Sequence, residues 1–205
     1  MRPEARPRAR AGAPQGKVLD PEFFARDTVA VARDLLGKIL VRERDDHVLF
    51  GRLVEVEAYL GPDDQAAHSF KGHRSPRNDV MYGDAGHAYV YFTYGMHHCL
   101  NFVTRERGIP QAVLARALEP GPSVGRCAGP GLICRSLNID RSLNGLELAP
   151  PQLYVLDDGF KPERIYATPR IGVYSSGDWS DKPLRFCVDS PHLSRPVPRA
   201  LRAID

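Results

Sequence analysis

One long alternating segment constrains the fold of this chain more than any other feature. From His47 to Tyr59, apolar side chains recur at every second position, which is the period of a β-strand and not of a helix. Shorter segments of the same kind follow along the chain, and helical spacing is confined to two places. Strands in succession with few helices between them favour an α+β domain with a mostly antiparallel sheet.

The expected elements follow from period, turn residues and capping residues. We expect a helix that Asp20 caps and Gly37 ends, and a short helix over 132–137 behind Gly129-Pro130-Gly131. A turn is expected at Asp45-Asp46, and residues 65–87 are expected to form a long ordered loop with at most short helices. Loops of this length in a compact domain are usually functional. The expected strands are 39–44, 47–59, 88–93, 96–104, 111–118, 152–156, 164–167, 171–173 and 185–188.

Charge divides the chain into two parts. Residues 1–17 hold five basic residues and one acidic residue, a balance of +4, whereas the remaining 23 basic and 24 acidic residues balance at −1. We expect a flexible basic tail over 1–17, serving as a solubilising arm or a phosphate tether, and one folded domain over 18–205. A nucleic-acid partner must therefore be argued from local clusters of charge.

Several classes of protein are disfavoured by what the sequence lacks. No apolar run approaches the ~20 residues that span a bilayer, and the arginine-rich start has no apolar signal region. Four cysteines without a C-x-x-C pair predict reduced thiols and a cytosolic location, with Cys127 and Cys134 as packing thiols. The fingerprints of dinucleotide-binding, P-loop and common zinc enzymes are also missing.

A metal site is not expected. The residues whose side chains could ligate a metal ion are His68, His73, His87, His97, His98 and Cys99. Residues 97–99 are consecutive on a predicted strand, so their side chains cannot all face one ion.

The long strand carries an unusual face. Val48, Phe50, Val54, Val56 and Ala58 form its apolar face, and the residues on the opposite face are Leu53, Glu55, Glu57 and Tyr59. Two readings stay open for the second face. It is either exposed to solvent, or it presents carboxylates on a rigid strand beside an aromatic surface, as a hydrolytic general base requires.

The predicted hairpin over 88–104 has a large aromatic residue at its turn. Tyr89, Tyr91 and Thr93 share a face of its first strand, and Tyr94 stands at the turn, where it cannot join the core of its own domain. Tyr94 either folds back on the surface or enters a partner, such as a stacked duplex, as a wedge. The basic residues near the hairpin and at the chain end suit phosphate contact or a solvated face: Lys71, Arg74, Arg77, Arg105 and Arg107, then Lys182, Arg185, Arg195, Arg199 and Arg202.

Five segments together resemble the 3-methyladenine (alkyladenine) DNA glycosylase family. They are GRLVEVEAYLGPDDQAAHS (51–69), SPRNDVMYG (75–83), AYVYFTYGMHHCLNFV (88–103), VLARALEP (113–120) and DKPLRFCV (181–188), in an order and spacing that match over about residues 20–190. The resemblance implies one α+β domain with a curved antiparallel sheet, surrounding helices and a protruding hairpin. It also implies an enzyme, without metal or redox cofactor, that excises alkylated or deaminated purines such as 3-methyladenine, 7-methylguanine and hypoxanthine from duplex DNA and leaves an abasic site.

The same resemblance implies a role for individual residues. Glu57 matches the general base that activates the attacking water, and Tyr94 matches the hairpin residue that fills the gap in the duplex. Glu57, Tyr59, Tyr91 and Tyr94 stand out from the residue pattern alone, whereas Asn101 and Arg116 come only from the resemblance. The other matches are Tyr59, His68 and Tyr91 around the flipped base, Asn101 against the guanine 2-amino group, and Leu114 and Arg116 near the extruded nucleotide and its phosphate.

Two other functions stay open beside this enzyme activity, and the sequence differs from the family pattern in two places. A damaged-DNA-binding protein that lost turnover is opposed by the presence of Glu57, and a hydrolase of small nucleosides is opposed by the wedge position and the basic clusters. The short segment 121–131 replaces a helical stretch of longer members, and His97-His98 follows the turn; both bear on DNA affinity and substrate range. The expected partner is duplex DNA with damaged purines. The protein is expected to be a monomer that does not associate with membranes, located in the nucleoid region of the cytoplasm if the source is bacterial.

Overall fold

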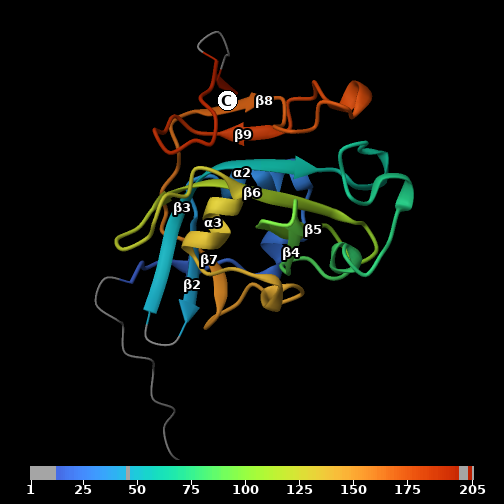
Figure 1. The fold of residues 1–205 in the computed structure, drawn as a ribbon. Coiled ribbons are helices and arrows are strands. Elements are labelled where there is room, and N and C mark those ends of the chain that lie inside the picture. The colour runs from blue at the N-terminus through green and yellow to red at the C-terminus, as the bar shows by residue number, and fades with distance from the viewer. Residues whose placement is uncertain (1–12, 45–46, 199–202, 205) are drawn as a thin grey trace, which may run out of the picture.

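The described chain forms one curved antiparallel sheet with short helices around it. The computed structural model describes residues 13–44, 47–198 and 203–204, and these ranges contain ten strands in a single sheet. The strand order is β1-β7-β2-β3-β6-β5-β4, and a branch β9-β8-β10 leaves from β3 (Figure 1). All of these pairs are antiparallel, so the α+β class expected from the sequence is confirmed.

The strand bounds agree with the alternating segments in all but a few places. The strands are β1 (Lys17–Val18), β2 (Ile39–Arg44), β3 (His47–Tyr59), β4 (Ala88–Thr93), β5 (His97–Thr104), β6 (Gln111–Pro120), β7 (Leu153–Asp157), β8 (Ile165–Thr168), β9 (Arg185–Cys187) and β10 (Ala203–Ile204). The strand expected over 171–173 is wrong, because this segment is a bend in the loop after β8.

The single helix expected after Asp20 is two helices. Asp20 caps α1 (Pro21–Phe24), and Asp27 caps α2 (Thr28–Leu35) by accepting hydrogen bonds from the N–H groups of Val29 and Ala30. A second capping carboxylate inside the apolar pattern therefore restarts the helix. The third helix, α3 (Pro130–Ser136), lies where the Gly-Pro-Gly segment predicted a start.

The core lies between the sheet and these helices. Val31 and Leu35 of α2 join Val54 and Val56 of β3 in the main apolar cluster, which also includes Ile133 of α3. The opposite face of β3 is buried as well: Glu55 and Glu57 are both 0% exposed. The solvent-exposed interpretation of that face is therefore wrong, and two buried carboxylates require partners.

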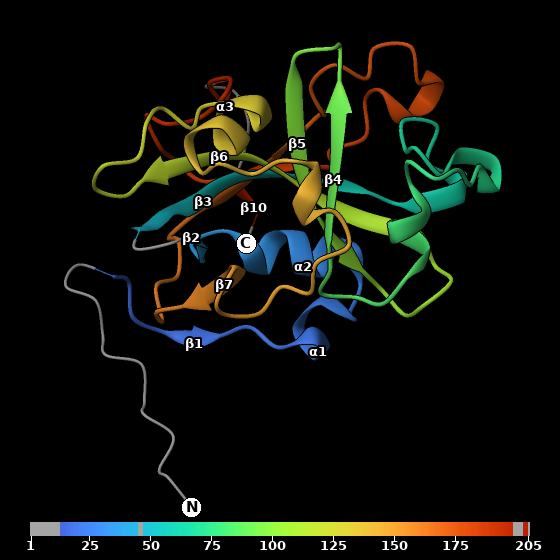
Figure 2. The same cartoon turned by 60° about the horizontal axis from the view of Figure 1, so that its bottom comes forward.

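The hairpin and the long loop project from one side of the sheet. Strands β4 and β5 pair with each other, and their turn rises beyond the sheet, with α3 on one side and the loop after β8 on the other (Figure 2). The ordered loop predicted over 65–87 is confirmed as part of a longer one over 61–87. Its only helical elements are the 3₁₀ turns η1 (Gly61–Asp63), η2 (Phe70–Gly72) and η3 (Asp79–Tyr82). Further 3₁₀ turns are η4 (Arg141–Leu143) and η5 (Gly177–Trp179).

The predicted tail is only partly described. Residues 1–12, and likewise the turn expected at Asp45-Asp46, lie outside the described residues. Lys17, placed in the tail, already pairs with Asp157 in the sheet. Among the described helices, none has the length and apolar character needed to cross a membrane.

Candidate active site

A cavity of about 510 Å³ opens between the hairpin, α3 and the loop after β8. This volume lies in the range of small-ligand pockets. Tyr91 and Tyr94 line it from the hairpin, Gly129 and Gly131 from the start of α3, and Ile171 from the loop. Seven of the eight residues predicted for the site line this cavity: Tyr59, His68, Tyr91, Tyr94, Asn101, Leu114 and Arg116.

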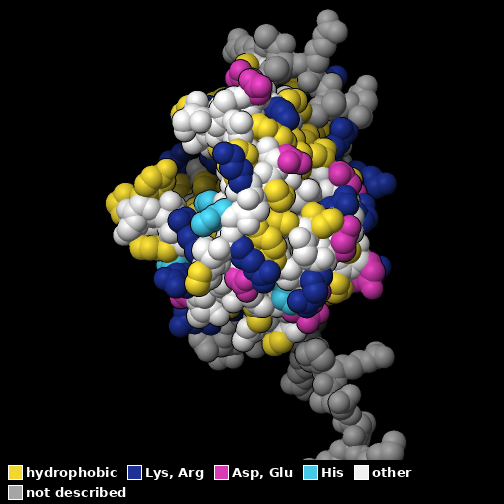
Figure 3. All heavy atoms as spheres, turned by 90° about the vertical axis from the view of Figure 1, so that its right-hand side faces the viewer, with side chains coloured by type: hydrophobic (Ala, Val, Ile, Leu, Met, Phe, Trp, Pro, Cys, Tyr) yellow, Lys and Arg dark blue, Asp and Glu magenta, His cyan; other side chains and the backbone are white. Residues whose placement is uncertain are grey.

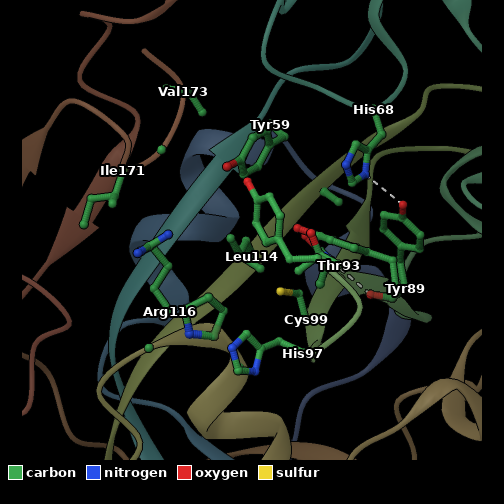
Figure 4. Close-up of a pocket in the computed structure, with 18 of the residues that line it drawn as sticks. Tyr59, His68, Tyr89, Thr93, His97, Cys99, Leu114, Arg116, Ile171 and Val173 are labelled. Atoms are coloured by element: carbon green, nitrogen blue, oxygen red, sulfur yellow. Dashed lines mark hydrogen bonds between the residues drawn. The ribbon is translucent and has the colours of Figure 1, made fainter. Parts of the chain in front are cut away.

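Aromatic rings form one part of the cavity wall. The Nδ1 atom of His68 lies 2.8 Å from the hydroxyl of Tyr89, and its ring stands edge-on to Tyr91 with centroids 4.6 Å apart. Figure 4 shows His68 and Tyr89 on one side of the cavity and Arg116 on the other, with Tyr59 and Cys99 between them in the view. Such rings suit a flat, unsaturated ligand, which they can contact with their faces.

His68 is uncharged in this setting. Burial, followed by the positive charge of Arg77, lowers the pKa of His68 to about 4. Burial likewise raises the pKa of Tyr59 well above its ordinary value. The wall is therefore made of neutral rings at physiological pH, while the guanidinium of Arg170 lies 4.6 Å from the ring centroid of Tyr59.

Glu57 lies directly behind this wall. It does not line the cavity, but three groups that bind its carboxylate belong to lining residues. Oε2 accepts a hydrogen bond from the Tyr59 hydroxyl at 3.0 Å and one from Nη1 of Arg116 at 3.3 Å, and Oε1 accepts one from the N–H of Ile171 at 2.8 Å. The carboxylate thus lies at the junction of the sheet and the loop.

Glu55, two residues earlier, is held more tightly. Its carboxylate accepts hydrogen bonds from Nε of Arg185 at 2.7 Å and from Nε of Arg116 at 3.1 Å. Ser194 adds two more, from its N–H and its hydroxyl, both at 2.6 Å. Glu55, Glu57, Arg116 and Arg185 therefore form a buried charge cluster that is formally neutral.

The two carboxylates have pKa values shifted in opposite directions. Burial raises the pKa of Glu57, and the charge of Arg116 and the N–H of Ile171 only partly oppose it. Burial also acts on Glu55, but the hydrogen bonds from Arg185 and Ser194 outweigh it and lower the pKa of Glu55. Glu55 is thus the permanent anion, and Glu57 is the group of the pair suited to proton transfer.

An irregularity in the sheet places Arg116. The register of β3 and β6 shifts twice, so that Glu55 pairs with Ala117 and Val56 with Ala115, and Arg116 has no partner opposite it. Bulged residues of this kind commonly redirect a side chain beside a site. The guanidinium reaches both carboxylates and borders the cavity.

A buried ion pair fixes the loop that carries Ile171. Arg170 is 3% exposed and donates to both carboxylate oxygens of Asp64, at 2.5 and 2.8 Å, and to the carbonyl of Ala58. These contacts join the loop after β8 to the end of β3 and to η1. The N–H of Ile171 is thereby held against Glu57.

The hairpin turn exposes a strained aromatic residue. Tyr94 is 86% exposed, and its φ of 51° lies in the left-handed region, as does the φ of 65° at Gly95. Positive φ at both central residues is the pattern of a type I′ turn, which prefers Asn-Gly. A tyrosine there costs about 1–2 kcal/mol, and neighbouring Met96 is 69% exposed. Backbone strain and exposed apolar side chains of this kind are more frequent at binding sites than elsewhere on a protein surface.

The remaining predicted residues lie deeper. The side-chain amide of Asn101 donates to the carbonyl of its cross-strand partner Tyr89 at 3.0 Å, and Asn101 and Leu114, which are register partners, are both 4% exposed. Cys99 also borders the cavity, and burial raises the pKa of its thiol.

Sequence reasoning missed Ile171, Ser194 and the role of Arg185. Ile171 acts through its backbone N–H, which no residue type reveals, and Ser194 lies far from the other residues in sequence. Arg185, expected to serve either phosphate contact or a solvated face, is 2% exposed and bonded to Glu55, so both readings are wrong for this residue. Arg199 and Arg202 lie outside the described residues.

The basic cluster near the hairpin is largely balanced by acidic groups. Arg74 is paired with Asp79, and Arg107 with Asp84. On the face shown in Figure 3, Lys and Arg side chains are interspersed with Asp and Glu. Within the described ranges, no group of three or more His, Cys, Asp or Glu is placed to hold a metal ion.

Comparison with known proteins gives a consistent result. The methylpurine-DNA glycosylase (MPG) family profile matches residues 22–192. Proteins named "Putative 3-methyladenine DNA glycosylase" are similar over most of the chain. The one from Desulfitobacterium hafniense (strain Y51) is 43% identical, covering 87% of this chain and 98% of the relative. Those from Legionella pneumophila (strain Paris) and Myxococcus xanthus (strain DK1622) are 46% and 44% identical, covering 87% and 90% of this chain and 98% and 97% of the relatives.

Proposed function

The chain belongs to the methylpurine-DNA glycosylase family, and from this premise we propose that it removes alkylated or deaminated purines from duplex DNA by hydrolysing the N-glycosidic bond. The observation that carries the proposal is the carboxylate of Glu57, bonded to Arg116, Tyr59 and the N–H of Ile171 behind an aromatic cavity. The product is an abasic site in an otherwise intact strand.

Base release from a duplex first requires that the nucleotide leave the stack. Extrusion costs roughly a few kcal/mol, least for a damaged or mispaired base. Tyr94, exposed at the tip of the hairpin, would offset part of this cost by filling the vacated position. The proposed partner is therefore double-stranded DNA, bound by a monomer.

The cavity suits a purine that is cationic or easily made so. Tyr59 and Tyr91 line the cavity, and each has a guanidinium over its ring, from Arg170 and Arg77. The opposite faces of these rings would favour a cationic base such as 3-methyladenine or 7-methylguanine by about 1–2 kcal/mol when water is excluded. Asn101, whose side-chain amide donates to the carbonyl of Tyr89 and which lines the cavity, would test the purine edge for a 2-amino group. Hypoxanthine is neutral and a poorer leaving group, so it requires protonation or hydrogen bonding as it departs.

Glu57 supplies the chemical step. As a carboxylate it takes a proton from water while the sugar develops positive charge, and its own negative charge stabilises that oxocarbenium-like centre. Arg116 would orient the water and the nucleotide phosphate, and Leu114 would pack beside the extruded nucleotide. His68, neutral and bonded to Tyr89, would enclose the base without competing for the proton.

The proposal is tested with Glu57→Gln. Duplexes that carry one defined lesion are incubated with enzyme in excess, and abasic sites are revealed by alkaline strand scission. We expect base release to fall by at least about 10³-fold while lesion-duplex binding persists, because the amide keeps the shape but cannot take a proton.

Two outcomes would contradict the proposal. Near-normal excision by Glu57→Gln would remove Glu57 from the chemistry. Lesion-specific binding without any base release by the unmodified protein would instead identify a damaged-DNA-binding protein of the same fold.

A further inference from the structure

A serine from outside the sheet, Ser194, is hydrogen-bonded to two members of the buried charge cluster, Glu55 and Arg116. Ser194 lies in the segment after β9, and its N–H donates to Glu55 on β3. Its hydroxyl donates to Glu55 at 2.6 Å and accepts from Nη2 of Arg116 at 3.3 Å. Ser194 itself does not line the cavity, so it can act on a substrate only through these two partners.

We propose that Ser194, with Glu55 and Arg185 behind it, is a positioning residue that fixes the Arg116 guanidinium against Glu57. The inference rests on the proposed function and adds the C-terminal segment to the parts of the chain on which base release depends.

The geometry around Arg116 supports this role. Each guanidinium nitrogen has a different acceptor: Nε donates to Glu55, Nη1 to Glu57 and Nη2 to Ser194. Arginine has five N–H donors, so these three contacts leave one N–H on each terminal nitrogen for water or phosphate. Since the three acceptors come from two segments, the plane of the guanidinium is fixed before a substrate arrives.

Ser194 is set in turn by its own hydrogen bonds. Its N–H and its hydroxyl donate to the two different oxygens of Glu55. The single hydroxyl proton is thereby committed to Glu55, so a lone pair faces Arg116. Arg185 completes the arrangement, because it donates to Glu55 and also to the carbonyl of Arg195 in the same segment.

The groups that face Glu57 come from every element packed against it. They are Arg116 on β6, Glu55 and Tyr59 on β3, Cys99 on β5 and the register partner Arg185 on β9. Arg116 is the cation that contacts Glu57 directly. Displacement of its guanidinium would therefore make Glu57 harder to ionise, whereas loss of the Glu55 charge would make it easier.

The test compares two serine variants of the same segment. Ser194→Ala removes the hydroxyl from the cluster, and Ser190→Ala is the matched control, because the Ser190 hydroxyl accepts only from the N–H of His192 among the described contacts. We expect Ser194→Ala to lower the maximal single-turnover rate of 7-methylguanine release about tenfold, with an unchanged half-saturating protein concentration. Ser190→Ala should match the unmodified protein, and Ser194→Thr should restore most of the rate.

A second measurement separates positioning from general structural damage. The titration of Glu57 is followed by carboxyl-carbon NMR in the free protein, together with the acidic limb of the pH–rate profile. We expect Ser194→Ala to move the Glu57 titration to higher pH, because its direct cation Arg116 is less well held, and Ser190→Ala to leave it unchanged. Damage to the fold alone would admit water to Glu57 and lower its pKa, so it would not give the upward shift.

The outcomes are distinguishable. If Ser194→Ala behaves as Ser190→Ala in both rate and titration, the positioning role is wrong. If the unmodified protein releases no base, the proposed function fails, and the titration of Glu57 in the two serine variants still decides the inference.

Discussion

At the scale of single residues, Glu55 and Glu57 lie on one strand but have pKa values shifted in opposite directions by their surroundings. Glu55 receives four hydrogen bonds from arginine and serine groups, and its pKa lies below the ordinary value. Glu57 receives three, one of them from a neutral phenol, and burial keeps its pKa above the ordinary value. The residue closer to the cavity is therefore the one that can exchange a proton.

The pH dependence of base release should report Glu57. Glu57 has a raised pKa and, in the proposed mechanism, must be ionised to act, so release of 7-methylguanine should increase as pH rises through an apparent pKa above 4.5. The pKa of His68 is about 4, so its protonation lies below that range. Single-turnover rates measured between pH 4.5 and pH 9 check this expectation.

His68→Gln is the control for this assignment. The variant should change the rate without moving the acidic limb, because His68 is already neutral there. A limb that disappears in His68→Gln would assign the titration to the histidine instead.

At the scale of elements, the β4–β5 hairpin carries a residue that its turn disfavours. The left-handed backbone at Tyr94 would be more stable with asparagine. We expect Tyr94→Asn to raise the free energy of unfolding by up to about 1 kcal/mol, while affinity for a lesion duplex falls at least about tenfold, the order of one stacking contact. Urea unfolding and fluorescence anisotropy measure the two effects.

The opposite pattern would change the interpretation of Tyr94. A loss of stability in Tyr94→Asn with unchanged DNA affinity would show that the ring supports the fold and does not enter the duplex.

Elements with a clear period were predictable from the sequence, and contacts between distant segments were not. The alternation in β3 and the turn at Tyr94-Gly95 follow from local patterns, as does the ordered loop after β3. The burial of Glu55 could not be foreseen, because the arginines that neutralise it lie on β6 and β9. The bulge at Arg116 depends on the pairing of β3 with β6, which periodicity within one strand does not specify.

At the scale of the whole molecule, the distribution of lysines bears on the type of reaction. A glycosylase that also cuts the strand uses an amine nucleophile and forms a Schiff base. The chain has Lys17, Lys38, Lys71, Lys161 and Lys182, and none of them lines the cavity. Lys38 is paired with Asp157, and the amine of Lys71 lies over the Phe70 ring.

We therefore expect no covalent adduct when borohydride is added during turnover of a lesion duplex. Denaturing gels should show a free protein band and an intact abasic strand. An adduct that is lost in Lys71→Ala would overturn the water-activation mechanism in favour of amine catalysis.

The charge cluster should also contribute to the stability of the fold. Arg185→Leu leaves Glu55 in the core without its closest cation, and breaking a buried pair in this way costs about 3–5 kcal/mol. Because the unpaired Glu55 can be protonated in the variant, the loss of stability should be smaller at low pH, where the carboxyl is neutral, than at pH 7. Urea unfolding at pH 7 and at pH 4 measures both effects, and an equal loss at the two pH values would contradict them.

The neutrality of this cluster limits how the sequence can diverge. A change at Glu55 or Arg185 alone leaves a buried charge without its counterpart, whereas a paired change to apolar residues of similar size removes both charges together. Substitutions at these two positions should therefore occur jointly among related proteins, although they lie 130 residues apart in the chain. Glu57 and Arg116 have no such freedom if both serve the reaction, and a joint change at Glu55 and Arg185 would keep the fold while loosening the position of Arg116.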